Sequence, residues 1–288
     1  MKSLKIFQID AFTKNSFEGN SAGVTFGSGL TKDEMQSIAK EMNLAETAFL
    51  SKSNKADYNL RWFTPTVEVN LCGHATIASL HFLKENGLLK ENSQIKFETR
   101  MGILNCGIEN GKYFMQVPVF NCMEYKENQK EILTALDIDP KDIDRKIPFI
   151  VLENGYLYIY IKSLTALKNL SPDFKELIKI NKAAKNLDSF TVFTLETFEK
   201  EDFAHIRFFA PYYGIDEDPV TGSANGPLML VLKKLGFVKE GEDETILTFE
   251  QGDIINRRGR VTVKHNSKLN NLYIMGNAVT VLKGELSF

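Results

Sequence analysis

Two stretches of the chain resemble each other, and they decide its fold. They are LRWFTPTVEVNLCGHATIASLHFLKENG, at 60–87, and IRFFAPYYGIDEDPVTGSANGPLMLVLKKLG, at 206–236. Each contains an arginine, two aromatic residues, a small residue and a proline in that order. Each then crosses a polar loop to a small-residue turn and continues as an apolar run. Both runs end at a glycine, the usual left-handed cap of a helix. The ordered set of matches predicts a duplicated domain.

The apolar runs predict one helix at about 74–86 and another at about 224–235. Both are apolar nearly all round, which is typical of a buried helix. Short strands surround each run, and the pairs Asn110-Gly111 and Asn154-Gly155 suit type I′ hairpin turns. We therefore expect an α+β fold with two pseudo-symmetric lobes. Each lobe would be a curved, mostly antiparallel, barrel-like sheet around a central helix.

The same pattern sets the expected boundaries. Residues 1–117 would form the N-terminal lobe, with 273–288 as a strand that could complete it. Residues 118–148, which carry polar runs and prolines, would be a linker with one helix. The C-terminal lobe would then cover 149–272.

Composition limits the classes of function. The chain has 288 residues, 43% hydrophobic and 25% charged, as in a soluble globular protein. A net charge of -2 gives no general attraction to nucleic acid or to an anionic membrane. No apolar stretch is long enough to span a bilayer, and the N-terminus alternates like a strand instead of a signal peptide. We expect a cytoplasmic protein with no nucleic-acid or membrane partner.

No metal or cofactor motif is present in the sequence. Cys72, Cys106 and Cys122 are scattered, and the four histidines form no HExxH-like pair. There is no GxGxxG or Walker loop either. We expect neither a metal nor a cofactor.

The first helix and the strand after it contain the first candidate residue. Thr31 and Glu34 form a capping box, an apolar face of period 3.6 follows, and Asn43 is a plausible stop. Glu46 then starts an apolar strand, where it shares a face with Ala48 and Leu50. On a solvated face Glu46 would be an ordinary surface residue. On a buried face, desolvation would favour its protonated form and suit it to proton transfer.

The two small-residue turns are candidate anion sites. Gly73 and Gly222 each precede a buried helix, whose free N–H groups and positive dipole end favour an anion. Pseudo-symmetry would bring both helix starts to the interface between the halves. The alternative is that these glycines merely allow a tight turn.

Three polar residues stand beside these turns. His74 and Ser223 could contact a substrate or simply occupy the first turn of a helix, and Asp218 could be a solvated loop residue or a cap. Cys72 lies where a two-thiol racemase would need a cysteine, but the second half has Pro219-Val220-Thr221 at the matching turn. Cys72 is therefore interpreted as a small, buried packing residue.

Three blocks of the sequence give a more specific indication. NLAETAFL around Glu46, RWFTPTVEVNLCGHATIAS and RFFAPYYGIDEDPVTGSANGPL resemble the signature blocks of the PhzF-like phenazine biosynthesis isomerase family. The two ends of the chain, IDAFTKNSFEGNSAGV and GNAVTVLKGEL, resemble that family as well. The resemblance implies a fold similar to that of diaminopimelate epimerase, with the active site between two lobes, and homodimers are common in the family.

The resemblance also implies roles for single residues. Glu46 matches the proton-shuttling glutamate, and Gly73, His74, Asp218, Gly222 and Ser223 match positions around the substrate. The expected activity is that of an isomerase or epimerase without a cofactor, moving a proton on a small carboxylate-bearing substrate. The alternatives are a binding or scaffold protein that keeps the fold, and a lyase or hydrolase that uses the same cleft.

Overall fold

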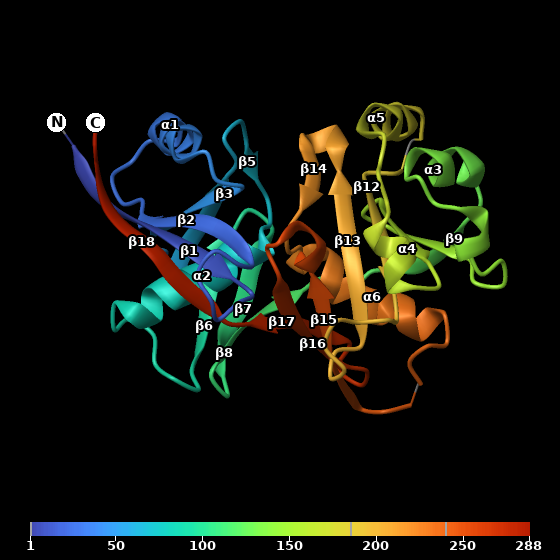
Figure 1. The fold of residues 1–288 in the computed structure, drawn as a ribbon. Coiled ribbons are helices and arrows are strands. Elements are labelled where there is room, and N and C mark those ends of the chain that lie inside the picture. Colours follow the sequence, from blue (N-terminus) through green and yellow to red (C-terminus); the bar gives the residue numbers. More distant parts are fainter. Residues whose placement is uncertain (1, 185, 240) are drawn as a thin grey trace. The chain divides into compact units, whose positions relative to one another are not determined.

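The chain folds into two compact units in the computed structural model, which describes residues 2–184, 186–239 and 241–288. One unit comprises Met1–Val117 with Tyr273–Phe288, and the other comprises Pro118–Leu272. Figure 1 shows the first unit in blue and cyan with the red C-terminal strand, and the second in green to orange. Within the described residues, no helix combines the length and the apolar character needed to cross a membrane.

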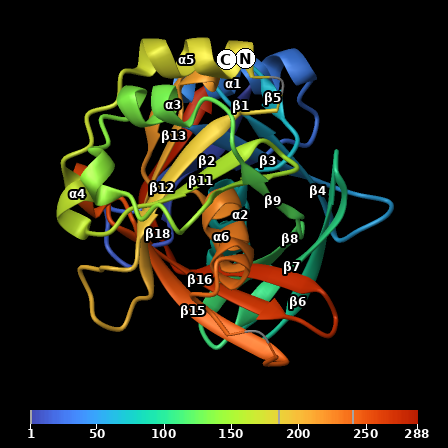
Figure 2. The same cartoon turned by 90° about the vertical axis from the view of Figure 1, so that its right-hand side faces the viewer.

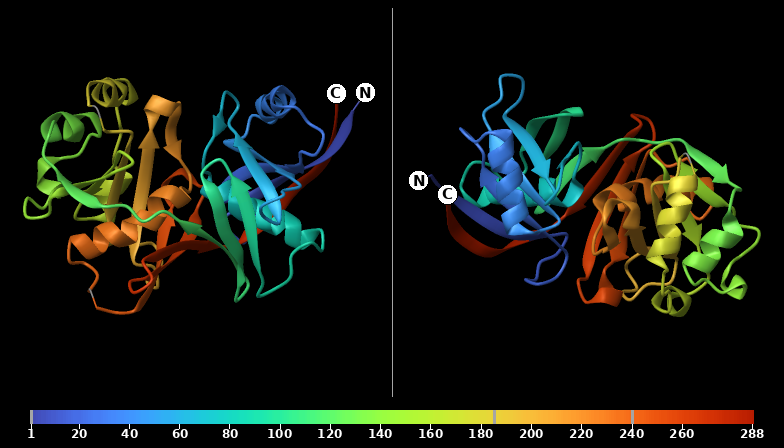
Figure 3. Two further views of the ribbon diagram at one scale, coloured as in Figure 1. Left: turned by 180° about the vertical axis from the view of Figure 1, so that it is seen from behind. Right: turned by 90° about the horizontal axis from the view of Figure 1, so that it is seen from above.

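The first unit is built on one mixed, mostly antiparallel sheet. Its strands pair in the order β18-β1-β2-β3-β4-β6-β7-β8, with β5 added to β4. The pairs β2–β3 and β4–β6 are parallel. The terminal strands β1 and β18 run side by side, as Figure 3 shows. The bounds are β1 (Ser3–Ala11), β2 (Asn20–Phe26), β3 (Glu46–Ser51), β4 (Tyr58–Phe63), β5 (Glu68–Val69), β6 (Gln94–Thr99), β7 (Gly102–Glu109), β8 (Lys112–Val117) and β18 (Ala278–Ser287).

Helix α2 (Gly73–Glu85) is the centre of this unit. It contacts strands at both ends of the pairing order, from β18 and β1 to β7 and β8, so the sheet curves around it. Apolar side chains such as Ile77 and Leu80 are fully buried there. Helix α1 (Lys32–Met42) packs on β3 and β4. Its predicted capping box is confirmed, and Asn43 ends it in the left-handed conformation.

The second unit repeats this order of elements. Strands β9 to β13 pair in sequence, β14 and β15 both pair with β13, and β16 pairs with β15. Helix α6 (Gly222–Lys234) contacts β9, β11 and β16, and Figure 2 shows it end-on above β15 and β16. The strands are β9 (Cys122–Tyr125), β10 (Phe149–Leu152), β11 (Tyr156–Tyr160), β12 (Ser189–Thr194), β13 (Ala204–Ala210), β14 (Ile215–Asp218), β15 (Glu244–Gln251) and β16 (Gly259–Asn266), while β17 (Asn271–Gly276) begins in this unit and ends in the first.

Three further helices, α3 (Gln129–Ala135), α4 (Leu164–Lys168) and α5 (Phe174–Ala183), cover the β10–β12 side of this sheet. Short 3₁₀ turns lie at Pro140–Asp142, Pro211–Tyr213 and Asp253–Ile255. The segment 118–148, expected to be a linker with one helix, contributes β9 and α3 to this unit.

The fold class predicted from the repeat is confirmed. In both units the strand that follows the buried helix pairs in parallel with a strand that precedes it: β6 with β4, and β15 with β13. The helices begin one or two residues earlier than predicted. Of the two Asn-Gly hairpins, Asn110-Gly111 forms the two-residue loop with both residues at positive φ.

The type I′ prediction for the second hairpin is wrong. There the Gly155 N–H donates to the Leu152 carbonyl at 2.9 Å, so Asn154-Gly155 occupies the last two positions of a four-residue turn. Gly155 has φ +80°, and a side chain there would meet Asp188. The sequence pair alone does not fix which positions of the turn it fills.

Candidate functional site

Glu46 lies at the start of β3, in contact with a histidine. Its Oε2 is 3.1 Å from Nε2 of His74, and the two side chains are 13% and 7% exposed. Ala48 and Leu50, which share its strand face, are fully buried. The solvated alternative for this face is therefore excluded, and the carboxylate stands at the end of a buried strand next to an imidazole.

His74 belongs to the first turn of α2. Cys72 precedes the helix in an extended conformation, and Gly73 and His74 open it. The backbone N–H groups of a first turn have no carbonyl partner within their own helix, so this end of α2 can attract an anion. The Cys72 sulfur is 3.6 Å from Nδ1 and 4.0 Å from Nε2 of His74, so the ring contacts both a thiol and a carboxylate.

Burial and mutual charge decide the protonation of this group. Burial, with the Glu46 carboxylate acting in the same direction, raises the pKa of Cys72 to about 11, so it is a thiol at neutral pH. Burial lowers the pKa of His74, but Cys72 and Glu46 together raise it by more, and it lies well above its ordinary value. A carboxylate beside an imidazole that readily carries a proton is a suitable arrangement for proton transfer.

The predicted residues of the second unit surround the start of α6. Asp218 is the last residue of β14, and its Oδ2 accepts a hydrogen bond of 2.5 Å from the Thr221 hydroxyl. Gly222 and Ser223 open the helix, and the Ser223 hydroxyl lies 3.3 Å from the Tyr156 hydroxyl. The structure thus brings Glu46, Gly73 and His74 together in one unit, and Asp218, Gly222 and Ser223 in the other.

Gln251 holds this second group in place, and the sequence analysis did not identify it. Its amide oxygen accepts from the Thr221 backbone N–H at 2.8 Å and from the Asn225 amide at 2.7 Å. Its amide nitrogen donates to the Asp218 carbonyl at 2.8 Å and to the Thr221 hydroxyl at 3.0 Å. Gln251 is 1% exposed. The available signal was its place at the end of the strand that follows α6.

A duplicated arginine–glutamate pair fixes the loop before each buried helix. Arg61 binds Glu68 through Nε and Nη2 at 2.7 and 3.0 Å, across β4 and β5. Arg207 binds Glu217 in the same bidentate way at 2.9 and 2.7 Å, across β13 and β14. The hydrogen bonds from Arg61 hold the pKa of Glu68 below its usual value. The repeated arginine was visible in the sequence, but its partner was not.

Among the residues that the structure describes, two groups of side chains have the residue types of a metal site. Glu46, Cys72 and His74 have ligand atoms within 4.8 Å of one another, as do His205, Glu250 and Asp253. In the first group Cys72 is a thiol at neutral pH, because burial raises its pKa to about 11.

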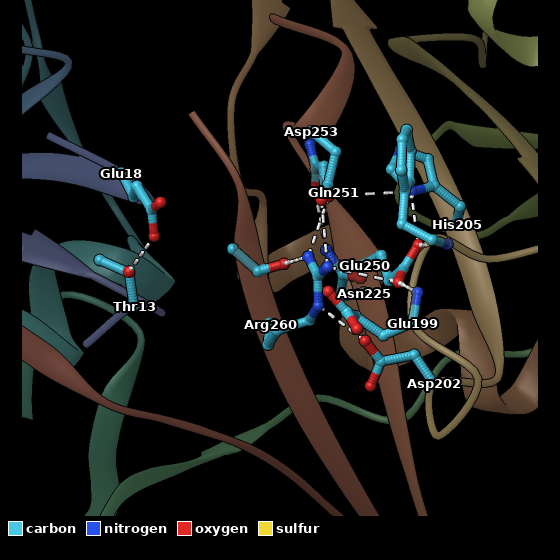
Figure 4. A network of polar contacts seen from close by, with 12 residues as sticks. Thr13, Glu18, Glu199, Asp202, His205, Asn225, Glu250, Gln251, Asp253 and Arg260 are labelled. Atoms are coloured by element: carbon cyan, nitrogen blue, oxygen red, sulfur yellow. Dashed lines mark hydrogen bonds and ion pairs between the residues drawn. The ribbon is translucent and has the colours of Figure 1, made fainter. Parts of the chain in front are cut away.

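The second group already contains a cation. The Arg260 guanidinium contacts Asp253 at 2.9 Å, Asp202 at 2.6 Å and Glu250 at 3.3 Å, and the Nδ1–H of His205 donates to Glu250 at 2.9 Å (Figure 4). This cluster is an ion-pair network that ties the loop before β13 to β15 and β16.

Comparisons with known proteins agree with the fold. The family model described as phenazine biosynthesis-like protein (PhzC-PhzF) matches residues 9–284. An uncharacterized isomerase of Clostridium acetobutylicum is 39% identical, with 99% of each chain covered. An uncharacterized isomerase of Bacillus subtilis is 35% identical over 92% of each chain.

Solved structures give the same result. A PhzF-family phenazine biosynthesis protein from Bacillus anthracis is 31% identical, covers 100% of both chains and has a TM-score of 0.92. A hydroxyproline epimerase from Agrobacterium vitis shares the fold, with a TM-score of 0.56, 12% identity and coverage of 99% of this chain and 92% of that one. The chain belongs to the phenazine biosynthesis-like (PhzC-PhzF) family.

Proposed function

We propose that this isomerase moves a proton on a small carboxylate-bearing substrate, with Glu46 as the acid–base group. The observation that carries the proposal is the contact of 3.1 Å between Glu46 Oε2 and His74 Nε2 at the start of a buried helix. The fold does not need a carboxylate at this position, because an apolar residue could take its place in a strand whose other residues are apolar or small.

The proposed step uses one carboxylate. Glu46 takes a proton from a carbon of the substrate and becomes a carboxylic acid, while the electron pair of the broken C–H bond moves into the conjugated system of the substrate. Glu46 then returns the proton to another carbon on the same face. His74 donates through Nε2–H to Glu46 and orients the carboxylate before the transfer.

Binding would come from the helix starts. The first-turn N–H groups at Gly73 and His74 provide donors and a positive dipole end for a substrate carboxylate. Asp218, Gly222 and Ser223 are proposed to contact the substrate too, with the Ser223 hydroxyl as a donor. A single base acting from one face favours a proton shift along the substrate, whereas inversion at one carbon needs groups on both faces.

Solvent exchange tests this proposal without knowledge of the natural substrate. A panel of small unsaturated and hydroxylated carboxylates is incubated with the wild-type protein in D₂O and followed by proton NMR. We expect a member of the panel to lose a C–H signal or to isomerise, and we expect Glu46→Gln to abolish that change. A panel member processed equally well by Glu46→Gln would contradict the proposal, and binding without any exchange would favour a binding protein.

A further inference from the structure

The duplication shows which residue of the second unit corresponds to Glu46. Arg61 and Arg207 are equivalent in the repeated sequence blocks, so they fix the correspondence. Arg61 lies opposite the residue three positions after Glu46, and Arg207 lies opposite the residue three positions after Ser189. Ser189 therefore takes the place of the carboxylate in the second unit.

Tyr156 is the neighbour of this serine in the sheet. It pairs with Ser189 across β11 and β12, just as Ala22 pairs with Glu46 across β2 and β3. Paired residues share a face of the sheet, so Tyr156 and Ser189 lie on the same side. Ser189 is 1% exposed, whereas the tyrosine is only partly buried. The second unit thus has a buried serine and an accessible tyrosine where the first has an accessible carboxylate and a buried alanine.

Tyr156 contacts the start of α6 as Glu46 contacts the start of α2. His74 and Ser223 are each the second residue of their helix. The hydroxyl oxygens of Tyr156 and Ser223 are 3.3 Å apart, and both side chains are partly exposed. The Tyr156 ring packs against the ring of Phe208, with centroids 5.3 Å apart. The acid–base contact of the first unit therefore corresponds to a contact between two hydroxyls in the second.

We propose that Tyr156 is a substrate-binding residue, whose hydroxyl forms with that of Ser223 a subsite for a neutral hydroxyl group of the substrate. This inference rests on the proposed function, because it assigns a second point of contact to the substrate whose proton Glu46 moves.

The chemistry of the two hydroxyls decides which group they bind. Each donates one hydrogen bond and also accepts, so the pair can donate to and accept from a hydroxyl of the substrate at the same time. Asp218 lies directly opposite Phe208 on β14, so a carboxylate is already present at this end of the sheet. A second anion would be repelled there, whereas a neutral hydroxyl would not. The subsite therefore selects among substrates and takes no part in the proton transfer.

The test compares the binding of benzoate with that of 3-hydroxybenzoate and 4-hydroxybenzoate, measured by NMR titration. Benzoate offers the carboxylate alone, and the other two probes add the neutral group. We expect one of the hydroxybenzoates to bind more tightly than benzoate by about 2–10-fold, which is the usual net value of one hydrogen bond. Tyr156→Phe removes only the hydroxyl, so it should abolish this preference and leave the affinity for benzoate unchanged.

Tyr158→Phe is the matched control. Tyr158 lies on the same face of β11 and donates to the Ala224 carbonyl of α6 at 2.8 Å, but it is 1% exposed and cannot reach a ligand. This variant should lower the thermal midpoint and keep the preference. Ser223→Ala should weaken the preference as Tyr156→Phe does, and the double variant should lose no more than either, because both hydroxyls bind one group.

Two results would overturn the proposal. One is a wild-type protein that binds neither hydroxybenzoate more tightly than benzoate, and the other is a preference that survives in Tyr156→Phe. Glu46→Gln should keep the preference, because binding does not require the transferred proton. The subsite can therefore fail while the Glu46 proposal stands, and a Glu46→Gln protein with normal turnover would remove the proposed function without changing these affinities.

Discussion

Replacing Gln251 by leucine tests how the residues at the start of α6 are held. The amide makes four hydrogen bonds, to the Asp218 carbonyl, the Asn225 amide and two atoms of Thr221. Each is worth roughly 0.5–1.5 kcal/mol net, which sums to about 2–6 kcal/mol. Leucine recovers part of that by burying apolar surface. We expect the free energy of unfolding to fall by about 2–4 kcal/mol.

Two measurements follow this change. Urea unfolding monitored by circular dichroism gives the global loss, and hydrogen exchange gives the protection of the Thr221 amide, which donates to Gln251. Gln251→Glu is a sharper second variant, because it keeps the acceptor oxygen but loses both donated hydrogen bonds and adds a buried charge beside Asp218.

A single exposed amide serves as the control. Gln94→Leu, at an exposed position of β6, should change stability by less than about 0.5 kcal/mol. The reasoning would be refuted by a Gln251→Leu protein within about 1 kcal/mol of the wild type whose Thr221 amide stays equally protected.

Two further predictions concern the ion pairs. Arg207→Lys should destabilise the protein by about 1–2 kcal/mol more than Arg61→Lys, as measured by urea unfolding. The reason is that Arg207 also donates to the Leu167 and Leu170 carbonyls and is more buried than Arg61. Equal losses of stability in the two variants would contradict this prediction. Burial, against the pull of Arg260, raises the pKa of Asp202 to about 6. Because the folded protein then holds this proton more tightly than the unfolded chain, the contribution of Asp202 to stability is lost as the pH rises from about 4 to about 6. The unfolding free energy of the wild type should therefore fall relative to that of Asp202→Asn over this window. If the difference in unfolding free energy between the two proteins were constant with pH, this role of Asp202 would be excluded.

The sequence predicted those features that depend on local chemistry and on internal repetition. The capping box of Thr31 and Glu34, the left-handed stop at Asn43 and the Asn110-Gly111 loop are all determined within a few residues. The two buried helices followed from their all-round apolar composition. The duplication then predicted two lobes of the same construction, each with a sheet around a central helix.

Features that depend on pairing between distant segments could not be predicted in the same way. Glu46 and His74 are 28 positions apart in the sequence, and their contact depends on how α2 lies against β3. Glu68 and Glu217 are recognisable as partners of Arg61 and Arg207 only once the neighbouring strands are paired. Cys72 was correctly expected to be buried, but its contact with the His74 ring was not expected. The predicted turn type at Asn154-Gly155 was wrong because the register of β10 and β11 decides which residues lie in the turn.

The most direct test of the central claim is the turnover of Glu46→Gln on a substrate that the wild type converts. Glutamine keeps the size and much of the hydrogen bonding of Glu46, but it cannot accept the proton. An acid–base group contributes roughly 10²–10⁴-fold in rate, so we expect turnover to fall by about that factor, with substrate binding and the thermal midpoint nearly unchanged. Glu41→Gln, at an exposed position of α1, is the control and should turn over like the wild type. Turnover of Glu46→Gln close to that of the wild type would remove Glu46 from the reaction.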